Sequence, residues 1–239
     1  MIHQKLWLEK WSTVSKKYYK QHKSAHQEEQ GMTTVLFVKA NNRPADQSIS
    51  VRLFEAFLAS YKESHPNDTV VELDLYNEEL PYVGADMING TFKSSRGLDL
   101  TVEEAKAVAV ADKYLDSFLA ADKVVFGFPL WNLTVPAVLH TYIDYLNRAG
   151  KTFKYTPEGP VGLIGNKKIV LLNASGGVYS EGPKVGLEMA VKYVTSMMNF
   201  FGVKNMETIV IEGHSQFPDK AEEIIVAGLE KAVKVSRTF

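Results

Sequence analysis

The chain has 239 residues, 45% of them hydrophobic and 23% charged, and its formal net charge is −1. A chain of this length buries about 70–75% of the surface that its unfolded form exposes, so its core needs no disulfide or metal. The absence of cysteine excludes disulfides, thiolate metal sites, thiolate-held iron–sulfur clusters and cysteine nucleophiles. The near-zero charge argues against nucleic acid as the main partner, and no apolar run approaches the roughly 20 residues that span a bilayer. We therefore expect a cytoplasmic protein that acts on neither nucleic acid nor membrane.

Residues 1–31 differ in composition from the rest of the chain. They are rich in lysine and other polar residues, and Trp7 and Trp11 are spaced to share one face of a short helix. One interpretation is a helix that binds a membrane surface or a partner. We prefer an N-terminal appendage that is disordered or forms a short helix, because Met32 leads directly into a strand pattern. The expected domain therefore covers residues 32–239.

From Thr33 onward, strand and helix patterns alternate along the chain. Short apolar runs typical of parallel strands occur at residues 35–38, 70–75, 123–128, 168–173 and 208–211. Helical patterns follow at residues 50–61, 101–119, 136–146, 187–201 and 219–235. This alternation predicts an α/β protein with a doubly wound, five-stranded parallel sheet. Ligands of such sheets bind at the carboxyl ends of the strands, so the loops after the first, third and fourth strands are the candidate site.

Local signals also predict where some elements end. Thr101 and Glu104 fit a capping box at the start of a helix, and Gly202 fits the C′ position after another. Two segments, residues 77–100 and 151–160, are rich in turn-forming residues. We expect both to be long loops that are mobile or functional.

The loop after the first predicted strand is polar and leads into a helix that carries Ser48 and Ser50 near its start. It has neither the G-x-G-x-x-G nor the P-loop pattern, so a dinucleotide or ATP site is poorly supported. A helix N-terminus offers unpaired N–H groups and partial positive charge, which suits a phosphate monoester. The alternative is plain N-capping by one of the two serines.

The two other loops suit a flat ring. After the third strand, Trp131 and Asn132 lie between two prolines, which predicts a stiff aromatic ledge. After the fourth strand, Gly176 and Gly177 allow backbone amides to approach a ligand closely. The alternatives are a Trp131 that packs on the next helix and an ordinary glycine turn. Taken together, the three loops fit a mononucleotide with a planar ring system.

A series of short motifs then makes the prediction more specific. These motifs are Ser48-Ile49-Ser50, Pro129-Leu130-Trp131-Asn132, residues 150–156, Gly159-Pro160, Ser175-Gly176-Gly177, Glu181-Gly182-Pro183, Phe200-Phe201-Gly202 and Glu212-Gly213-His214. In order and spacing, the chain from Met32 to Phe239 resembles the FMN-dependent NADH:quinone oxidoreductase and azoreductase family. The resemblance implies a flavodoxin-like fold with strand order 2-1-3-4-5.

The resemblance also implies how a cofactor would be held. The residues implied are Ser48, Ile49 and Ser50 for the FMN phosphate, Leu130, Trp131, Asn132 and Leu133 for the isoalloxazine, and Ala174, Ser175, Gly176 and Gly177 for its pyrimidine edge. Two positions depart from the family pattern. Many members have Tyr at the position of Trp131, and many have Arg at the position of Ser175. The first departure changes the size of the ledge, and the second removes a cation near the ring.

The activity implied is transfer of two electrons from NAD(P)H to quinones and, by ping-pong reduction, to azo compounds. FMN would be tightly bound, one per subunit of a homodimer, with NADH as co-substrate and a quinone or azo compound as acceptor. The cofactor carries the chemistry in this family, so we assign no catalytic side chain and no metal.

Two alternatives remain at this stage. One is a non-enzymatic, flavodoxin-like electron carrier, although such carriers are usually strongly acidic and this chain is near neutral. The other is a scaffold or sensor that has the fold but no flavin. The acceptor used in the cell and the preference for NADH or NADPH are not readable from the sequence.

Overall fold

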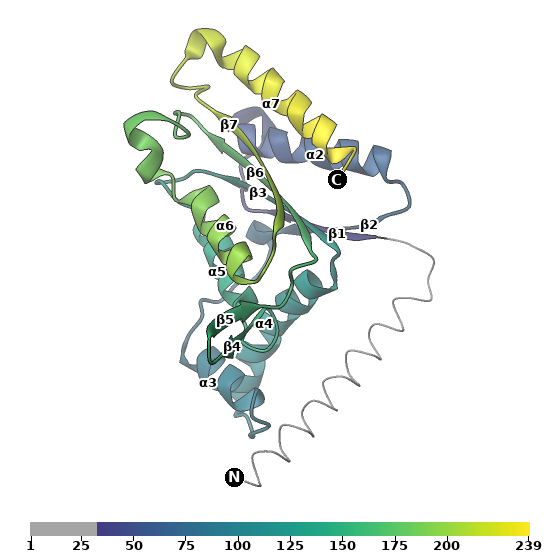
Figure 1. Ribbon diagram of the computed structural model, residues 1–239, viewed down its shortest axis with the longest axis vertical. Coiled ribbons are helices and arrows are strands. Elements are labelled where there is room, and N and C mark those ends of the chain that lie inside the picture. The colour runs from purple at the N-terminus through teal and green to yellow at the C-terminus, as the bar shows by residue number, and fades with distance from the viewer. Residues whose placement is uncertain (1–32) are drawn as a thin grey trace. The chain divides into compact units, whose positions relative to one another are not determined.

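A single parallel sheet forms the centre of the computed structural model, which describes residues 33–239 (Figure 1). The interpretation of residues 1–31 as an appendage lies outside the described residues. The five strands are β1 (Thr34–Lys39), β2 (Thr69–Asp74), β3 (Lys123–Pro129), β6 (Lys168–Ser175) and β7 (Asn205–Glu212). Their order, β2-β1-β3-β6-β7, confirms the predicted doubly wound sheet with the order 2-1-3-4-5 of its main strands.

Helices cover both faces of this sheet (Figure 1). One face packs against α2 (Ile49–Ser64) and α7 (Ala221–Ser236), and the other against α4 (Val102–Ala120), α5 (Ala137–Leu146) and α6 (Ala190–Phe200). Helix α3 (Ala85–Ser94) packs on α4. The alternation within β1 explains the two layers. Val35 and Phe37 belong to the core beneath α2 and α7, whereas Leu36 and Val38 belong to the opposite core. A strand that is apolar on both sides can only be buried between two helical layers.

Helix ends follow the local signals where those signals are strong. The Thr101 hydroxyl accepts from the Glu104 amide at 3.2 Å, and the Glu104 carboxylate accepts from the Thr101 amide at 2.9 Å, which confirms the capping box. Gly202 follows Phe201, the C-cap residue of α6, and has φ +96°, as a C′ glycine requires. Short 3-10 helices occupy Ala45–Gln47, Leu75–Asn77, Gly182–Leu187 and Pro218–Lys220. The 3-10 helix Gly182–Leu187 ends at the residue where the sequence predicted α6 to begin. As a result, α6 begins later, at Ala190. Within residues 33–239, no helix combines the length and apolarity that a membrane crossing needs.

The prediction of a long loop over residues 77–100 is wrong, because this segment contains α3. Gly90, which reads as a helix breaker, is the point where α3 crosses α4. A Cβ at Gly90 would lie 2.7 Å from a methyl group of Val108 and 3.0 Å from the Glu104 carbonyl oxygen. An ion pair of 2.7 Å between Lys93 and the buried Glu104 joins the same two helices. The glycine therefore permits packing that no local pattern reveals.

The prediction of a loop over residues 151–160 is also wrong, because most of it forms an antiparallel hairpin. Its strands are β4 (Phe153–Thr156) and β5 (Gly159–Gly162), with Tyr155 opposite Pro160. Each strand has only four residues, and prolines and glycines lie in and between them, so the pattern resembled a loop. Gly162 fits closely against the end of α6, since a Cβ there would lie 2.2 Å from the Gly202 nitrogen.

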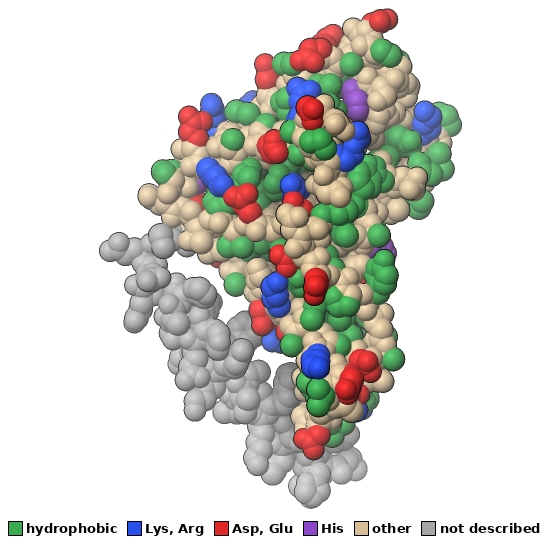
Figure 2. Space-filling view, turned by 180° about the vertical axis from the view of Figure 1, so that it is seen from behind, with side chains coloured by type: hydrophobic (Ala, Val, Ile, Leu, Met, Phe, Trp, Pro, Cys, Tyr) green, Lys and Arg blue, Asp and Glu red, His purple; other side chains and the backbone are tan. Residues whose placement is uncertain are grey.

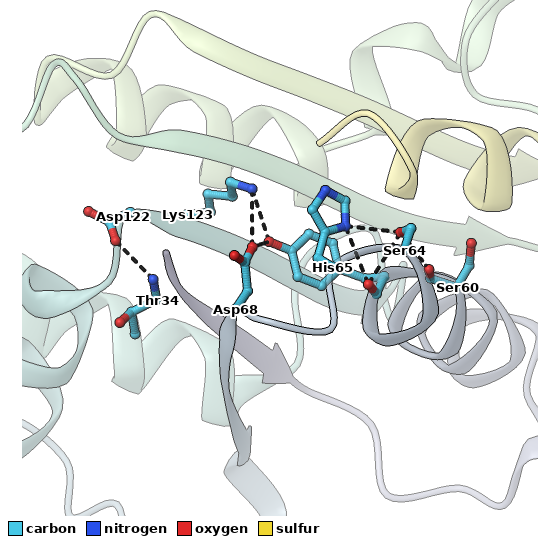
Figure 3. Close-up of polar contacts among 8 residues, drawn as sticks. Thr34, Ser60, Ser64, His65, Asp68, Asp122 and Lys123 are labelled. Carbon is cyan, nitrogen blue, oxygen red and sulfur yellow. Dashed lines mark hydrogen bonds and ion pairs between the residues drawn. The ribbon is translucent and has the colours of Figure 1, made fainter. Parts of the chain in front are cut away.

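The amino edge of the sheet is held by a polar cluster away from the candidate site (Figure 3). The Tyr61 hydroxyl donates to the Asp68 carboxylate at 2.5 Å and accepts from the Lys123 ammonium at 2.9 Å. Burial and the neighbouring Asp68 carboxylate raise the pKa of Tyr61 well above its ordinary value, so this phenol remains a donor. The cluster joins the end of α2 to the start of β3, and Asp122 accepts from the Thr34 amide at 2.9 Å beside it.

Helix α2 lies against β3 with little separation. A Cβ at Gly127 would stand 2.4 Å from Cδ2 of Phe54 and 3.1 Å from its Cβ. Phe54 is buried in the core beneath α2 and α7, so a group added at Gly127 would displace packed side chains. The close approach sets the height of α2 above the sheet.

We expect Gly127→Ala to lower the free energy of unfolding by about 1–3 kcal/mol, because the added methyl group overpacks the contact with Phe54. Urea unfolding monitored by circular dichroism would measure the change. Gly186→Ala is the matched control, since a Cβ at Gly186 meets nothing within 4 Å and φ there is ordinary. Equal stability of the two variants would contradict the close approach.

Candidate active site at the carboxyl edge of the sheet

The three loops identified from the sequence start at neighbouring strand ends. In the register of the parallel strands, Lys39 at the end of β1 pairs with Gly127 of β3, and Pro129 of β3 pairs with Ala174 of β6. Backbone bonds continue the pairing into the loops, since the Ala40 amide donates to the Gly127 carbonyl at 2.8 Å and the Leu130 amide to the Ala174 carbonyl at 3.0 Å. The loops therefore emerge side by side at the carboxyl edge.

In the first loop, Asn41 organises the two serines. Its side-chain amide donates to the Ser48 hydroxyl at 2.8 Å and to the Ser50 hydroxyl at 3.0 Å, and its side-chain oxygen accepts from the Arg43 amide at 2.9 Å. Asn41, Ser48 and Ser50 are all buried. Since both hydroxyl oxygens accept from Asn41, and the two oxygens are 3.2 Å apart, at least one hydroxyl hydrogen is free to donate to a ligand.

The sequence analysis did not single out Asn41 in the polar first loop. Its position directly after a buried strand was the available signal. An asparagine that accepts from the amide two residues later also fits an Asx turn, which fixes its side chain.

The start of α2 is open to an anion. Ser48 is the N-cap residue in an extended conformation, but its side chain makes no capping bond to the helix. Thr101, in the same position on α4, does make that bond. The simple capping interpretation of Ser48 is therefore wrong, and the first N–H groups of α2 keep the partial positive charge that attracts a phosphate. Buried hydroxyl donors beside a helix N-terminus fit the phosphate of a mononucleotide.

The second loop is a tight turn rather than a proline-stiffened ledge. Trp131 and Thr134 exchange two backbone hydrogen bonds of 3.0 Å each. Between them, Asn132 and Leu133 have φ values of +49° and +70°. Two positive φ values in succession are those of a type I′ turn. Asparagine adopts a positive φ readily, whereas leucine adopts it only with strain. The Leu133 carbonyl accepts from the Met189 amide at 2.9 Å, which anchors the turn to the start of α6.

The third loop is a glycine turn supported by the loop that follows β7. The Gly176 carbonyl accepts from the amides of Ser215 and Gln216, each at 3.0 Å. A Cβ at Gly176 would lie 2.8 Å from the Ser215 hydroxyl oxygen, so a side chain here would displace Ser215. The Ser175 hydroxyl donates to the Gly177 carbonyl at 2.9 Å and therefore stabilises the turn itself.

His214 lies in the same supporting loop. Its Nδ1 is buried and has no hydrogen-bond partner among the described residues. Burial lowers the pKa of His214 below its ordinary value, so the ring is neutral at pH 7. Within residues 33–239, no group of three or more histidine and carboxylate side chains is arranged to hold a metal.

This geometry agrees with what is known of similar chains. The family described as having a flavodoxin-like fold matches residues 33–235. Together, the doubly wound sheet, the three loops and this match define a flavodoxin-like protein.

Similar proteins and solved structures identify the family within the flavodoxin-like class. The chain is 83% identical over 208 residues to FMN-dependent NADH:quinone oxidoreductase 4 of a Bacillus cereus strain, covering 87% of this chain and 100% of the relative. A crystal structure of an azoreductase from Bacillus anthracis (strain Sterne) is 82% identical, with a TM-score of 0.86, and covers 87% of this chain and 100% of that one. An FMN-dependent NADH-azoreductase of Bacillus anthracis (strain Ames Ancestor), crystallised with FMN, is 28% identical with a TM-score of 0.76, covering 86% and 100%. The chain belongs to the FMN-dependent NADH:quinone oxidoreductase and azoreductase family.

The type I′ turn can be tested at Asn132, whose side chain is exposed. We expect Asn132→Val to lower the free energy of unfolding by about 1–2 kcal/mol, because a β-branched residue is disfavoured at positive φ. Asn132→Gly, which tolerates that conformation, should change it by no more than about 0.5 kcal/mol. Urea unfolding of both variants gives the comparison, and equal losses would argue against the turn.

Proposed function

We propose that this chain is an FMN-dependent oxidoreductase that transfers two electrons from NADH to quinones and azo compounds. The observation that carries the proposal is the convergence of three loops at one sheet edge. One offers buried hydroxyl donors at a helix N-terminus, one a rigid turn bearing Trp131, and one a glycine turn. High identity to relatives named for this activity supports the same conclusion.

The phosphate of FMN would be held by Asn41, Ser48 and Ser50 together with the first amides of α2. We assign Ile49 to the same contact through its backbone, because it is the first residue of α2. Hydroxyl and amide donors that are already positioned lose little ordering entropy when an anion binds. Asn41 is added here to the residues that the sequence implied.

The ring of FMN would lie between the second and third loops. We assign Leu130, Trp131, Asn132 and Leu133 to its side, and the segment Ala174, Ser175, Gly176 and Gly177 to its pyrimidine edge. When bound, FMN supplies the hydride acceptance and electron donation that no amino-acid side chain provides. The chain orients the ring, excludes water from one side of it and offers amide donors to its carbonyl-rich edge.

A homodimer completes the proposal. Large apolar side chains are exposed on the segment before α3, on α3, on the turn after it and on the hairpin, which is unusual for a monomer surface. They are Tyr82 (80% exposed), Ile88 (59%), Phe92 (50%), Leu98 (53%) and Tyr155 (75%). A second copy that covers such groups would remove them from water.

The charge distribution agrees with small, planar substrates. On the face that Figure 2 shows, acidic and basic side chains of the described residues are interspersed. A nucleic-acid partner would favour a broad basic area instead.

Because NADH is supplied inside cells, the proposal includes a cytoplasmic location. An electron carrier of the flavodoxin kind is the second candidate, and its expected strong acidity is absent from this near-neutral sequence.

The test is a spectrum of the purified protein followed by a steady-state assay. We expect a yellow protein with flavin absorbance that bleaches on anaerobic addition of NADH. NADH consumption should depend on an added naphthoquinone and follow ping-pong kinetics, because both substrates use one site in turn. Bleaching without quinone turnover would favour the carrier, and a colourless protein that refuses added FMN would contradict both.

The phosphate site can be tested by Ser48→Asp. We expect FMN affinity to fall at least about tenfold, because a carboxylate in the buried cluster repels the phosphate. Ala59→Asp is the matched control, since it adds a carboxylate at an exposed position of the same helix. Fluorescence titration of apoprotein with FMN measures both variants, with circular dichroism to check the fold. Unchanged affinity in Ser48→Asp would show that the phosphate binds elsewhere.

A further inference from the structure

A surface hollow of about 370 Å³ adjoins the glycine turn. It lies between the segment after that turn and the loop after β7, and its volume is within the range of small-ligand sites. The lining residues that matter here are Val178, Glu181, Pro183, Lys184, Gln216 and Phe217. None of them is among the residues that the family resemblance assigns to FMN.

The walls of the hollow are fixed by hydrogen bonds between its two loops. The Val178 amide donates to the Gln216 side-chain oxygen at 3.1 Å, and the amides of Tyr179 and Ser180 donate to the Glu212 carboxylate at 2.7 and 3.1 Å. The Ser180 hydroxyl donates to the other oxygen of Glu212. The hollow is therefore formed before any ligand arrives, and Glu212 is fully occupied in building it.

Glycine at position 213 lets the apolar wall close. A Cβ there would lie 2.9 Å from a methyl group of Val178 and 3.4 Å from the ring of Phe217. Its φ of +85° is also one that favours glycine. As a result, Val178 and Phe217 approach one another across Gly213, and Phe217 keeps 45% of its surface exposed toward solvent.

Lys184 brings a cation to this wall. Its ammonium stands 3.8 Å from the position that a Cβ of Gly177 would take, and 5.8 Å from the centre of the Tyr179 ring. Within residues 33–239, no carboxylate forms an ion pair with Lys184. Glu181 is the acid that shares the hollow, and it is exposed to solvent.

We propose that this hollow is a subsite for the anionic group of an aromatic ligand, with Lys184 as its cation. Apolar walls from Val178, Pro183 and Phe217 suit an aryl ring, and the ammonium suits a carboxylate, sulfonate or phosphate attached to it. The subsite rests on the proposed function, since it adjoins the turn assigned to the ring edge of FMN. The cation also lies beside the turn in which Ser175 stands where many relatives have arginine.

Two ligands of the proposed reaction carry an anionic group. One is an acceptor with a carboxylate or sulfonate attached directly to its aromatic ring. The other is NADH, whose diphosphate is joined to its aromatic adenine through a ribose. The chemistry at Lys184 is the same in both cases, so substrate kinetics must separate them. Binding of a ligand that cannot be reduced tests the subsite itself, apart from turnover.

The binding experiment uses the FMN-loaded protein and two matched probes, naphthalene-2-sulfonate and the neutral naphthalene-2-sulfonamide. By isothermal titration calorimetry, we expect Lys184→Gln to weaken sulfonate binding about tenfold, the lower end for a hydrogen bond to a charged group. The sulfonamide should lose much less, and Lys184→Arg should restore most of the sulfonate affinity. Lys231→Gln, which removes the same charge from an exposed site on α7, is the control and should behave as the unmodified protein. Equal sulfonate affinity with and without the Lys184 charge would overturn the subsite.

Kinetics then identify the source of the anion. If an acceptor uses the subsite, Lys184→Gln raises the KM of a carboxylated azo compound relative to that of a neutral naphthoquinone. If NADH uses it, the KM of NADH rises instead. The proposal is overturned if Lys184→Gln changes neither the KM of the carboxylated azo compound relative to that of the neutral quinone nor the KM of NADH. Failure of the proposed function is a separate result, because it would appear in the unmodified protein as absent FMN or absent turnover with the neutral quinone.

Discussion

The register between parallel strands is the constraint on which the site depends. Since β1, β3 and β6 are hydrogen-bonded neighbours, their carboxyl ends reach the same edge, and three loops far apart in sequence begin within one pairing network. The register is stable because both faces of the central strands are apolar and buried by helices on each side. Gly127 contributes to this packing, since its missing side chain lets Phe54 of α2 lie close against β3.

Side-chain capping differs between the starts of α2 and α4. Helices α2 and α4 both begin after a hydroxyl residue, but Thr101 satisfies its own helix whereas Ser48 accepts from Asn41. A buried hydroxyl that is withheld from its helix leaves orphan amide donors, which cost free energy until an anion occupies them. The uncapped start of α2, with buried hydroxyls beside it, is consistent with the phosphate site proposed there.

Preorganisation extends from the glycine turn to the loop after β7. The Gly176 carbonyl, the Gln216 side chain and the Glu212 carboxylate join the two loops without help from a ligand. The subsite proposed at Lys184 adjoins these joined loops. Electrostatic function at such an edge depends on where a charge lies in space and little on its place in the chain.

The sequence by itself determined the alternation of strands and helices, the capping box at Thr101 and the C′ glycine at 202, because each depends on residues close together in the chain. It also located the three loops, since parallel strands impose where ligands bind, and its motifs indicated the family. Only the tertiary structure decided that α3 and the β4–β5 hairpin exist, that Asn41 holds both serines, and that Asn132 and Leu133 form a turn with positive φ. Helix α3 and the hairpin pack through close approaches between separate segments, Gly90 with Val108 and Gly162 with Gly202, which no local pattern encodes.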